Sequence, residues 1–324
     1  MPIANSIRNI KRSYNIFAKT TLLHKFLYFL AALVCISLMT NYGRKCVEGF
    51  EEQVKSNEFD MRDAVHDIYD DYYVSIYDDL VFNKNKNDYE VSKLITLTTP
   101  NDKSKFLDIG SGTGHHVSSI KAHGYNAIGI DISPGMIKQS KTTYPELEFK
   151  QADALDPSIF PEQRFTHITC FYFTIYYIQN KQQFFENCFK WLISGGFLAI
   201  HLVNRDKFDP ILPAGNPFSI VSPQKYAKKR ITSTTVKFDN MEYKSNFDMK
   251  TTVATSDSPN AFMIETFKNA KNGNVRKNEH KFYMNTQAEI LDIAKEAGFI
   301  IHAKLDLLPC QYESQYIYIL QKPS

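Results

Sequence analysis

Cysteine is scarce in this chain, and the few cysteines do not form a recognisable ligand set. The 324 residues include five cysteines, and no two of them are spaced as C-x-x-C. An odd number of scattered cysteines disfavours a disulfide framework and a zinc site, and it favours a reducing compartment. We therefore expect no bound metal.

The sequence also lacks a strong excess of either charge. The formal net charge is +3, and no stretch interleaves basic and aromatic residues as nucleic-acid-binding surfaces do. No nucleic-acid partner is therefore expected. Residues 225–281 differ from the rest, because they carry twelve basic and six acidic residues. This local excess predicts either a solvated surface or contact with an anionic, phosphate-bearing molecule.

Charged residues are absent from residues 26–43, an eighteen-residue span bounded by Lys25 and Arg44. A helix that crosses a membrane needs about 20 residues and can manage with about 17. We expect a single-pass membrane anchor here, preceded by a basic leader (1–25) and followed by a linker (44–60). A buried core helix and a cleaved signal peptide are the alternatives.

Glycine is not abundant, yet three glycines lie at alternate positions in one short segment. Residues 107–114 read Leu-Asp-Ile-Gly-Ser-Gly-Thr-Gly, and a helix-compatible segment, 115–123, follows directly. A strand, a tight turn and a helix start mark the place where an open α/β sheet binds its cofactor. The spacing Gly110-x-Gly112-x-Gly114 is not the G-x-G-x-x-G of a nicotinamide or flavin site, which disfavours a nicotinamide-dependent oxidoreductase.

Further apolar runs follow in the order that an open α/β sheet requires. The second ends in Asp131, about 20 residues after the glycines, where dinucleotide-binding folds place an acid on the ribose hydroxyls. The third is followed by another acid, Asp153. The expected strands are 106–109, 127–131, 149–154, 165–171 and 196–203.

This order of elements resembles that of class I S-adenosylmethionine-dependent methyltransferases, over about residues 60–324 and most strongly in the cofactor half. The resemblance implies an α/β fold with a Rossmann-like, seven-stranded sheet and helices on both faces. It also implies S-adenosylmethionine as cofactor and S-adenosylhomocysteine as product. A methyltransferase domain is therefore expected at 61–324.

The resemblance further implies which residues hold the cofactor. The first acid and the glycines would contact the amino-acid end, the second acid would accept the ribose hydroxyls, and the third would take the adenine amino group. Each acid has an alternative role as a helix cap or turn residue. The expected cofactor-binding residues are Asp108, Gly110, Gly112, Gly114, Asp131, Ile132, Met136, Asp153, Ala154, Phe171 and Tyr77.

A tyrosine-rich segment, 67–79, precedes the glycines and resembles the lid that small-molecule methyltransferases place over the cofactor. Plain aromatic packing is the alternative. Upstream of it, residues 47–71 are acid-rich with few large apolar side chains, which predicts a spacer that becomes helical.

After the fifth strand the chain predicts an antiparallel β insert at about 208–284. Its layout resembles nucleotide-sugar N-methyltransferases, in which such an insert covers the acceptor, and it favours a small, anionic acceptor and a homodimer through the insert. A capped helix (286–297) and a closing hairpin should follow. The expected insert strands are 231–238, 243–249, 262–267 and 279–284, and the hairpin strands are 299–305 and 315–320.

Four side chains at the right strand ends are candidate catalytic groups, because methyl transfer to a hydroxyl is helped by a histidine or tyrosine. Since His201 lies between Ile200 and Leu202, a core histidine is the favoured interpretation there. The candidates are Tyr172, Tyr176, His201 and His280.

The sequence thus predicts methyl transfer from S-adenosylmethionine to nitrogen or oxygen of a small molecule. Phe171-Tyr172-Phe173-Thr174 stands where enzymes that methylate nucleobase amines have Asn/Asp-Pro-Pro-Tyr, which disfavours that class. The alternative is a membrane-tethered binding protein that keeps the fold without the chemistry.

Basic residues before the expected anchor favour an N-terminus in the cytosol, whereas the cofactor favours a cytosolic catalytic domain. The cofactor argument carries more weight, so a cytosolic catalytic domain is expected, and the charge bias leaves the opposite orientation as the alternative.

Overall fold

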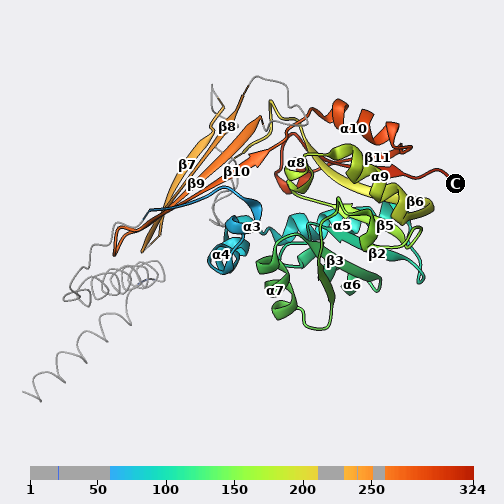
Figure 1. Ribbon diagram of the computed structural model, residues 1–324, viewed down its shortest axis with the longest axis horizontal. Coiled ribbons are helices and arrows are strands. Elements are labelled where there is room, and N and C mark those ends of the chain that lie inside the picture. Colours follow the sequence, from blue (N-terminus) through green and yellow to red (C-terminus); the bar gives the residue numbers. More distant parts are fainter. Residues whose placement is uncertain (1–20, 22–58, 211–229, 239, 251–259) are drawn as a thin grey trace, which may run out of the picture. The chain divides into compact units, whose positions relative to one another are not determined.

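The computed structural model describes residues 21, 59–210, 230–238, 240–250 and 260–324, and residues 56–324 form one compact unit (Figure 1). The expected anchor, the basic leader and nearly all of the linker lie outside the described residues. Among the helices of the described part, none is long and apolar enough to cross a membrane.

A seven-stranded sheet forms the centre of this unit, as predicted, in the order β11-β12-β6-β5-β2-β3-β4. From β4 to β6 neighbouring strands are parallel, so their carboxyl ends lie at one edge, and β12 is antiparallel to β6 and β11. The strands are β2 (Lys105–Ile109), β3 (Asn126–Asp131), β4 (Glu148–Gln151), β5 (Phe165–Cys170), β6 (Leu192–Val203), β11 (Ile300–Asp306) and β12 (Gln315–Gln321).

Helices cover both faces of this sheet because its central strands are apolar on both sides. Phe106 packs with α5 and α6 on one face, whereas Leu107 joins the core under α9 and α10 on the other. Thr286 and Glu289 form the capping box that starts α10, as predicted. The helices are α5 (Lys84–Thr98), α6 (His115–Ala122), α7 (Pro134–Thr143), α8 (Thr174–Tyr177), α9 (Lys181–Trp191) and α10 (Gln287–Glu296), with 3₁₀ turns η1 (Pro157–Ile159) and η3 (Leu308–Cys310).

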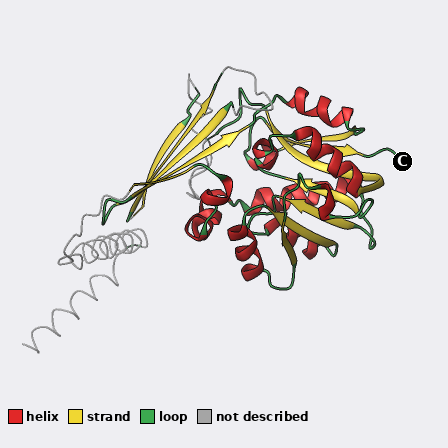
Figure 2. Cartoon of the chain, viewed as in Figure 1, coloured by secondary structure: helices red, strands yellow, loops and turns green. Residues whose placement is uncertain are grey.

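A second sheet of five strands, in the order β1-β10-β9-β8-β7, contains the predicted antiparallel insert (Figure 2). The strand β1 was not predicted, because its residues were expected to be linker and helical spacer. It pairs in parallel with β10, more than 200 residues later in the chain, and no local pattern announces such a partner. The strands are β1 (Phe59–Arg62), β7 (Ser233–Phe238), β8 (Met241–Met249), β9 (Ala261–Asn269) and β10 (Val275–Phe282).

The tyrosine-rich segment forms two helices, α3 (Val65–Ile68) and α4 (Asp71–Val81), rather than one. The break occurs at Asp70, whose backbone is extended and whose carboxylate accepts a hydrogen bond from Tyr73 N at 3.0 Å. That carboxylate also accepts from Arg62 at 2.7 Å and from Arg276 at 2.8 Å. Figure 1 shows α3 and α4, which we call the lid, between the second sheet and α7.

The Arg276–Asp70 contact predicts how firmly the lid is held. Replacing Arg276 with glutamine removes charged hydrogen bonds to Asp70 and to the Ile68 carbonyl, each worth about 1.5–3 kcal/mol. Amide hydrogen exchange in residues 72–81 should therefore accelerate about tenfold or more. As a matched control, Lys281→Gln on the same strand breaks an exposed pair with Asp63 and should leave the exchange unchanged. Equal protection in both variants would contradict this role for Asp70.

Candidate active site

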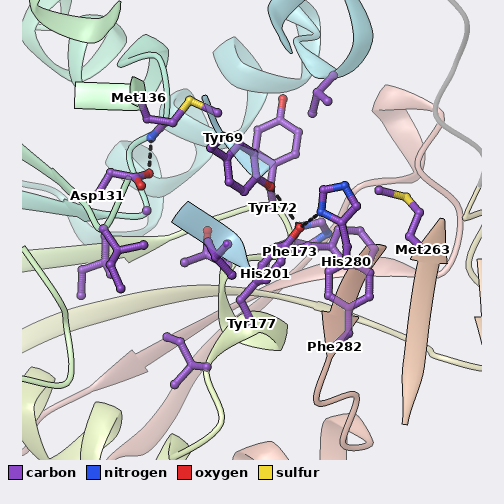
Figure 3. A pocket seen from close by; sticks show the side chains of 18 of the residues that line it. Tyr69, Asp131, Met136, Tyr172, Phe173, Tyr177, His201, Met263, His280 and Phe282 are labelled. Atoms are coloured by element: carbon purple, nitrogen blue, oxygen red, sulfur yellow. Dashed lines mark hydrogen bonds between the residues drawn. The ribbon is translucent and has the colours of Figure 1, made fainter. Parts of the chain in front are cut away.

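A cavity of about 410 Å³ lies at the carboxyl ends of β2, β3 and β5. The glycine turn and the residues after β3 and β4 form one side of it. The lid, the loop after β5 and the inner face of the insert form the other, as Figure 3 shows for ten labelled side chains. Eleven of the fifteen predicted site residues line this cavity: Tyr77, Gly110, Gly112, Asp131, Ile132, Met136, Asp153, Ala154, Tyr172, His201 and His280.

The glycine turn is made of three residues with positive φ, which side chains rarely tolerate. Gly110, Gly112 and Gly114 have φ of 68°, 52° and 95°. A Cβ at Gly110 would lie 2.5 Å from the Thr174 side chain, and one at Gly114 would lie 2.6 Å from the Phe149 ring. At Gly112 the nearest atom would be in the Tyr77 ring, 4.0 Å away. Gly110 and Gly114 are therefore required by packing, and Gly112 alone leaves space on the cavity side.

Asp131 connects this turn to the next strand. Its two carboxylate oxygens accept hydrogen bonds from Gly112 N at 3.0 Å and from Ser133 N at 2.9 Å. Burial raises the pKa of the Asp131 carboxyl to about 6, although these backbone donors oppose the shift. The carboxylate is thus fixed in orientation, and each oxygen keeps a free lone pair for a donor in the cavity.

The side chains that follow β3 and β4 supply an apolar wall. Ser133 caps α7 by accepting from Met136 N, which directs the start of that helix toward the cavity. Ile132 is 48% exposed and lines the cavity, so its apolar surface is available to pack against a ligand. Asp153 lines the cavity and also accepts a hydrogen bond from Leu155 N at 2.9 Å, as the alternative role of a turn residue predicts.

Four predicted residues do not line the cavity: Asp108, Gly114, Phe171 and Tyr176. The strand alternation turns Phe171 into the core beside α5 and α6, and Tyr172 and Phe173 take its place at the cavity. The Tyr176 hydroxyl accepts a hydrogen bond from Val203 N at 2.8 Å in the core. Because Tyr176 does not reach the cavity, it cannot contact a substrate there, and the prediction that it is catalytic is wrong. Asp108 lies beneath the turn, where one oxygen accepts from Thr169 and the other, buried, has no partner.

His201 lines the cavity, but its chemistry does not suit a base. Burial, and after it the nearby Lys86 ammonium, lowers the pKa of its imidazole to about 3. A group with that pKa takes up little proton at neutral pH. Lys86 is the only lysine or arginine among the described residues that line the cavity; it is fully buried, bonds Glu90 at 2.5 Å, and lies 3.7 Å from the centre of the Tyr172 ring.

His280 is the candidate that the structure connects most fully. One ring nitrogen, Nδ1, lies 2.6 Å from the Tyr177 hydroxyl, and the other, Nε2, lies 2.8 Å from Glu265. Tyr177 in turn lies 3.0 Å from the Tyr69 hydroxyl on the lid. Sequence reasoning missed Tyr69, Tyr177, Glu265 and Lys86. For Glu265 a signal existed, since strand alternation puts this acid on the same inward face as Ala261, Met263 and Phe267.

Comparison with known proteins agrees with this geometry. Residues 107–200 match the family model described as a methyltransferase domain. A putative methyltransferase of Invertebrate iridescent virus 6 is 35% identical over 97 residues, 29% of this chain and 35% of that protein. The phosphoethanolamine N-methyltransferase of Plasmodium falciparum is 31% identical over 113 residues, 33% of this chain and 42% of that protein. Residues 107–200 therefore match a methyltransferase domain, in the half of the chain that contains the glycine turn and Asp131.

The matches to these curated relatives span only about two fifths of their length or less, whereas the likeness in fold is wider. CalS10, an amino pentose methyltransferase from Micromonospora echinaspora solved with S-adenosylmethionine bound, superposes with a TM-score of 0.54 at 15% identity. That comparison covers 78% of this chain and 96% of CalS10. The likeness in fold thus extends well beyond the matched residues 107–200.

The residues present fit the cofactor of this family. Gly112 leaves room for a backbone-sized group, Asp131 presents two oriented acceptors, and the unpaired oxygen of Asp108 is a buried acceptor close to the turn. The amino-acid end would lie against Gly110 and Gly112, the ribose against Asp131, and the adenine beside Ile132 and Met136.

Substitutions of Gly112 and Gly114 predict separable effects on binding and stability. Gly112→Ala and Gly114→Ala share the strain of positive φ, about 1–2 kcal/mol. Only the second also overpacks Phe149, so it should lower the unfolding free energy by about 1–3 kcal/mol more. Only the first puts a methyl group into the cavity, so it should weaken S-adenosylhomocysteine binding at least tenfold in calorimetry. Gly112→Ala with wild-type affinity would show that the ligand does not lie on the turn.

The raised pKa of Asp131 predicts that the affinity for S-adenosylhomocysteine depends on pH. Because its pKa of about 6 lies above the ordinary value near 4, lowering the pH through 6 protonates the carboxyl and removes acceptors for the ribose hydroxyls. S-adenosylhomocysteine affinity should be full at pH 8 and should fall by up to about tenfold per pH unit below 6. Asp131→Asn should bind weakly throughout and lack this titration. A wild-type affinity that is constant from pH 5 to 8 would contradict the assignment.

Proposed function

We propose that the protein transfers a methyl group from S-adenosylmethionine to a nitrogen or oxygen of a small-molecule acceptor. The observation that carries this proposal is the shape of the cavity. Its cofactor side, made by the glycine turn and Asp131, continues without a wall into a side made by the lid and the insert. A ligand held on the first side therefore faces the second.

When bound, the sulfonium of the cofactor supplies an electrophilic methyl group and its own leaving group. The protein then has to position the acceptor and exclude water. Phe173, Phe208, Phe247 and Phe282 form an apolar wall on the acceptor side. The lid closes the opening, since Asp78 accepts from Thr113 at 2.6 Å and lies 2.8 Å from His115, at the glycine turn.

A sugar amine is the acceptor we favour within this class. The supporting observation is the likeness in fold, insert included, to an amino pentose methyltransferase. The nucleotide part of such an acceptor would supply the anionic character expected from residues 225–281. Arg230, one of the basic residues of this stretch, donates to the carbonyls of Phe208 and Arg205, so other basic residues would have to contact the anion.

A tethered binding protein without chemistry is the second candidate. It would be favoured by an eroded cofactor site, whereas the turn glycines, Asp131 and the apolar wall are all in place. Anchoring through residues 26–43 and dimerisation through the insert are further proposals from the sequence, and neither depends on which reaction the protein catalyses.

Calorimetry and a transfer assay on the full-length chain in detergent test the proposal. S-adenosylmethionine and S-adenosylhomocysteine should bind, and NAD should not. With methyl-labelled cofactor, a panel of amino sugars, nucleotide-linked amino sugars, phosphoethanolamine and simple alcohols should contain at least one acceptor that Asp131→Asn fails to methylate. Cofactor binding with no transfer to any member would support the binding protein instead.

A further inference from the structure

We propose that Tyr177, His280 and Glu265 form a proton relay that takes a proton from the acceptor during methyl transfer. The reacting group of the acceptor is then an amine or a hydroxyl, which holds a proton at neutral pH. This inference rests on the proposed function and names the chemistry of its acceptor side.

The relay is a continuous chain of short contacts from three separate elements, and Figure 3 shows its first contact, between Tyr177 and His280. Tyr177 at the end of α8 lies 2.6 Å from His280 Nδ1 on β10. His280 Nε2 lies 2.8 Å from the Glu265 carboxylate on β9. Tyr177 and His280 line the cavity, whereas Glu265 is fully buried behind them. The chain thus leads from the acceptor side of the cavity into the insert.

The direction of proton movement follows from Glu265. Although burial favours its neutral form, His280 and the surrounding donors outweigh burial and lower the pKa of Glu265, so it is a carboxylate that can only accept. Tyr243 donates to its other oxygen at 2.8 Å. In the neutral form of His280 the one ring proton then resides on Nε2, beside this carboxylate, and Nδ1 accepts from Tyr177. This is the logic by which a buried acid orients a catalytic histidine.

The other titratable groups that face His280 cannot replace it as the proton acceptor. Tyr69 and Tyr73 on the lid have ring centres 6.1 and 6.0 Å from the imidazole. Burial raises the pKa of Tyr69, Tyr73 and Tyr177 well above 10, so all three remain protonated at neutral pH. Tyr177 passes a proton on, and His280 receives it.

The step balances without any further reactant. The acceptor gives its N–H or O–H proton to the Tyr177 oxygen while the Tyr177 proton moves to His280 Nδ1. The freed lone pair forms the bond to the methyl carbon, and the electrons of the broken carbon–sulfur bond stay on sulfur. An imidazolium paired with Glu265 is left, and it returns its proton to solvent. Carboxylate and thiolate acceptors, already deprotonated, would not need this relay.

Kinetics on the acceptor found in the panel test the relay. His280→Gln and Tyr177→Phe should each lower kcat at least a hundredfold and leave the affinity for S-adenosylhomocysteine unchanged. Glu265→Gln should lower kcat similarly, because it no longer fixes the Nε2–H form. Tyr318→Phe is the control, since it deletes a phenol whose partner, Gln287, lies away from the cavity. Unchanged kcat in His280→Gln would overturn the relay.

A second measurement needs no acceptor and separates the relay from the proposed function. In protein with ¹⁵N-labelled histidine, the resonance of His280 is identified among the nine histidines by its loss in His280→Gln. At pH 8 we expect a neutral ring with the proton on Nε2. A proton on Nδ1, or a doubly protonated ring, would overturn the relay whatever the panel gives. Failure of the panel with the expected tautomer would contradict the proposed function alone.

Discussion

The arrangement of the lid depends on the carboxylate of Asp70, which accepts hydrogen bonds from three segments of the chain. Asp70 starts α4 and accepts from Arg62 on β1 and Arg276 on β10, and so ties the lid to the second sheet. The lid and the second sheet also share an apolar cluster, in which Ile68 and Tyr73 pack with Tyr243 and Phe267. The partly buried Asp70–Arg276 contact adds charged hydrogen bonds to this packing and fixes where α4 begins against the second sheet.

The acceptor and cofactor sides are built by different means. The surface of the cofactor side is defined mainly by backbone geometry, namely three positive-φ glycines and two backbone donors to Asp131. On the acceptor side, side chains from the lid, α8 and the insert meet without sharing a backbone element. The cofactor side is therefore suited to one fixed ligand. The side chains of the acceptor side can be substituted without disturbing the central sheet.

This division explains what could be predicted from sequence. The order of the strands, the glycine turn and Asp131 follow from short-range patterns, and the structure places them as expected. Phe171 was expected at the cavity but lies in the core, because side chains alternate at strand ends and one residue changes the face. The relay and β1 were missed because they depend on pairing between distant segments: Tyr69 with Tyr177, Tyr177 with His280, and Phe59 with Val275. No local pattern specifies which distant partner is chosen.

The helix α6 begins at Gly114 with no side chain to cap it, and the carboxylate of Asp78, from the lid, lies against Thr113 and His115 at that end. The lid thus supplies the negative charge that a helix N-terminus prefers. A cofactor on the same turn would share this helix end and lie beside Tyr77 of the same lid helix. Any contact between the two would couple their free energies, and reciprocity requires that the lid and the cofactor then stabilise each other by the same factor.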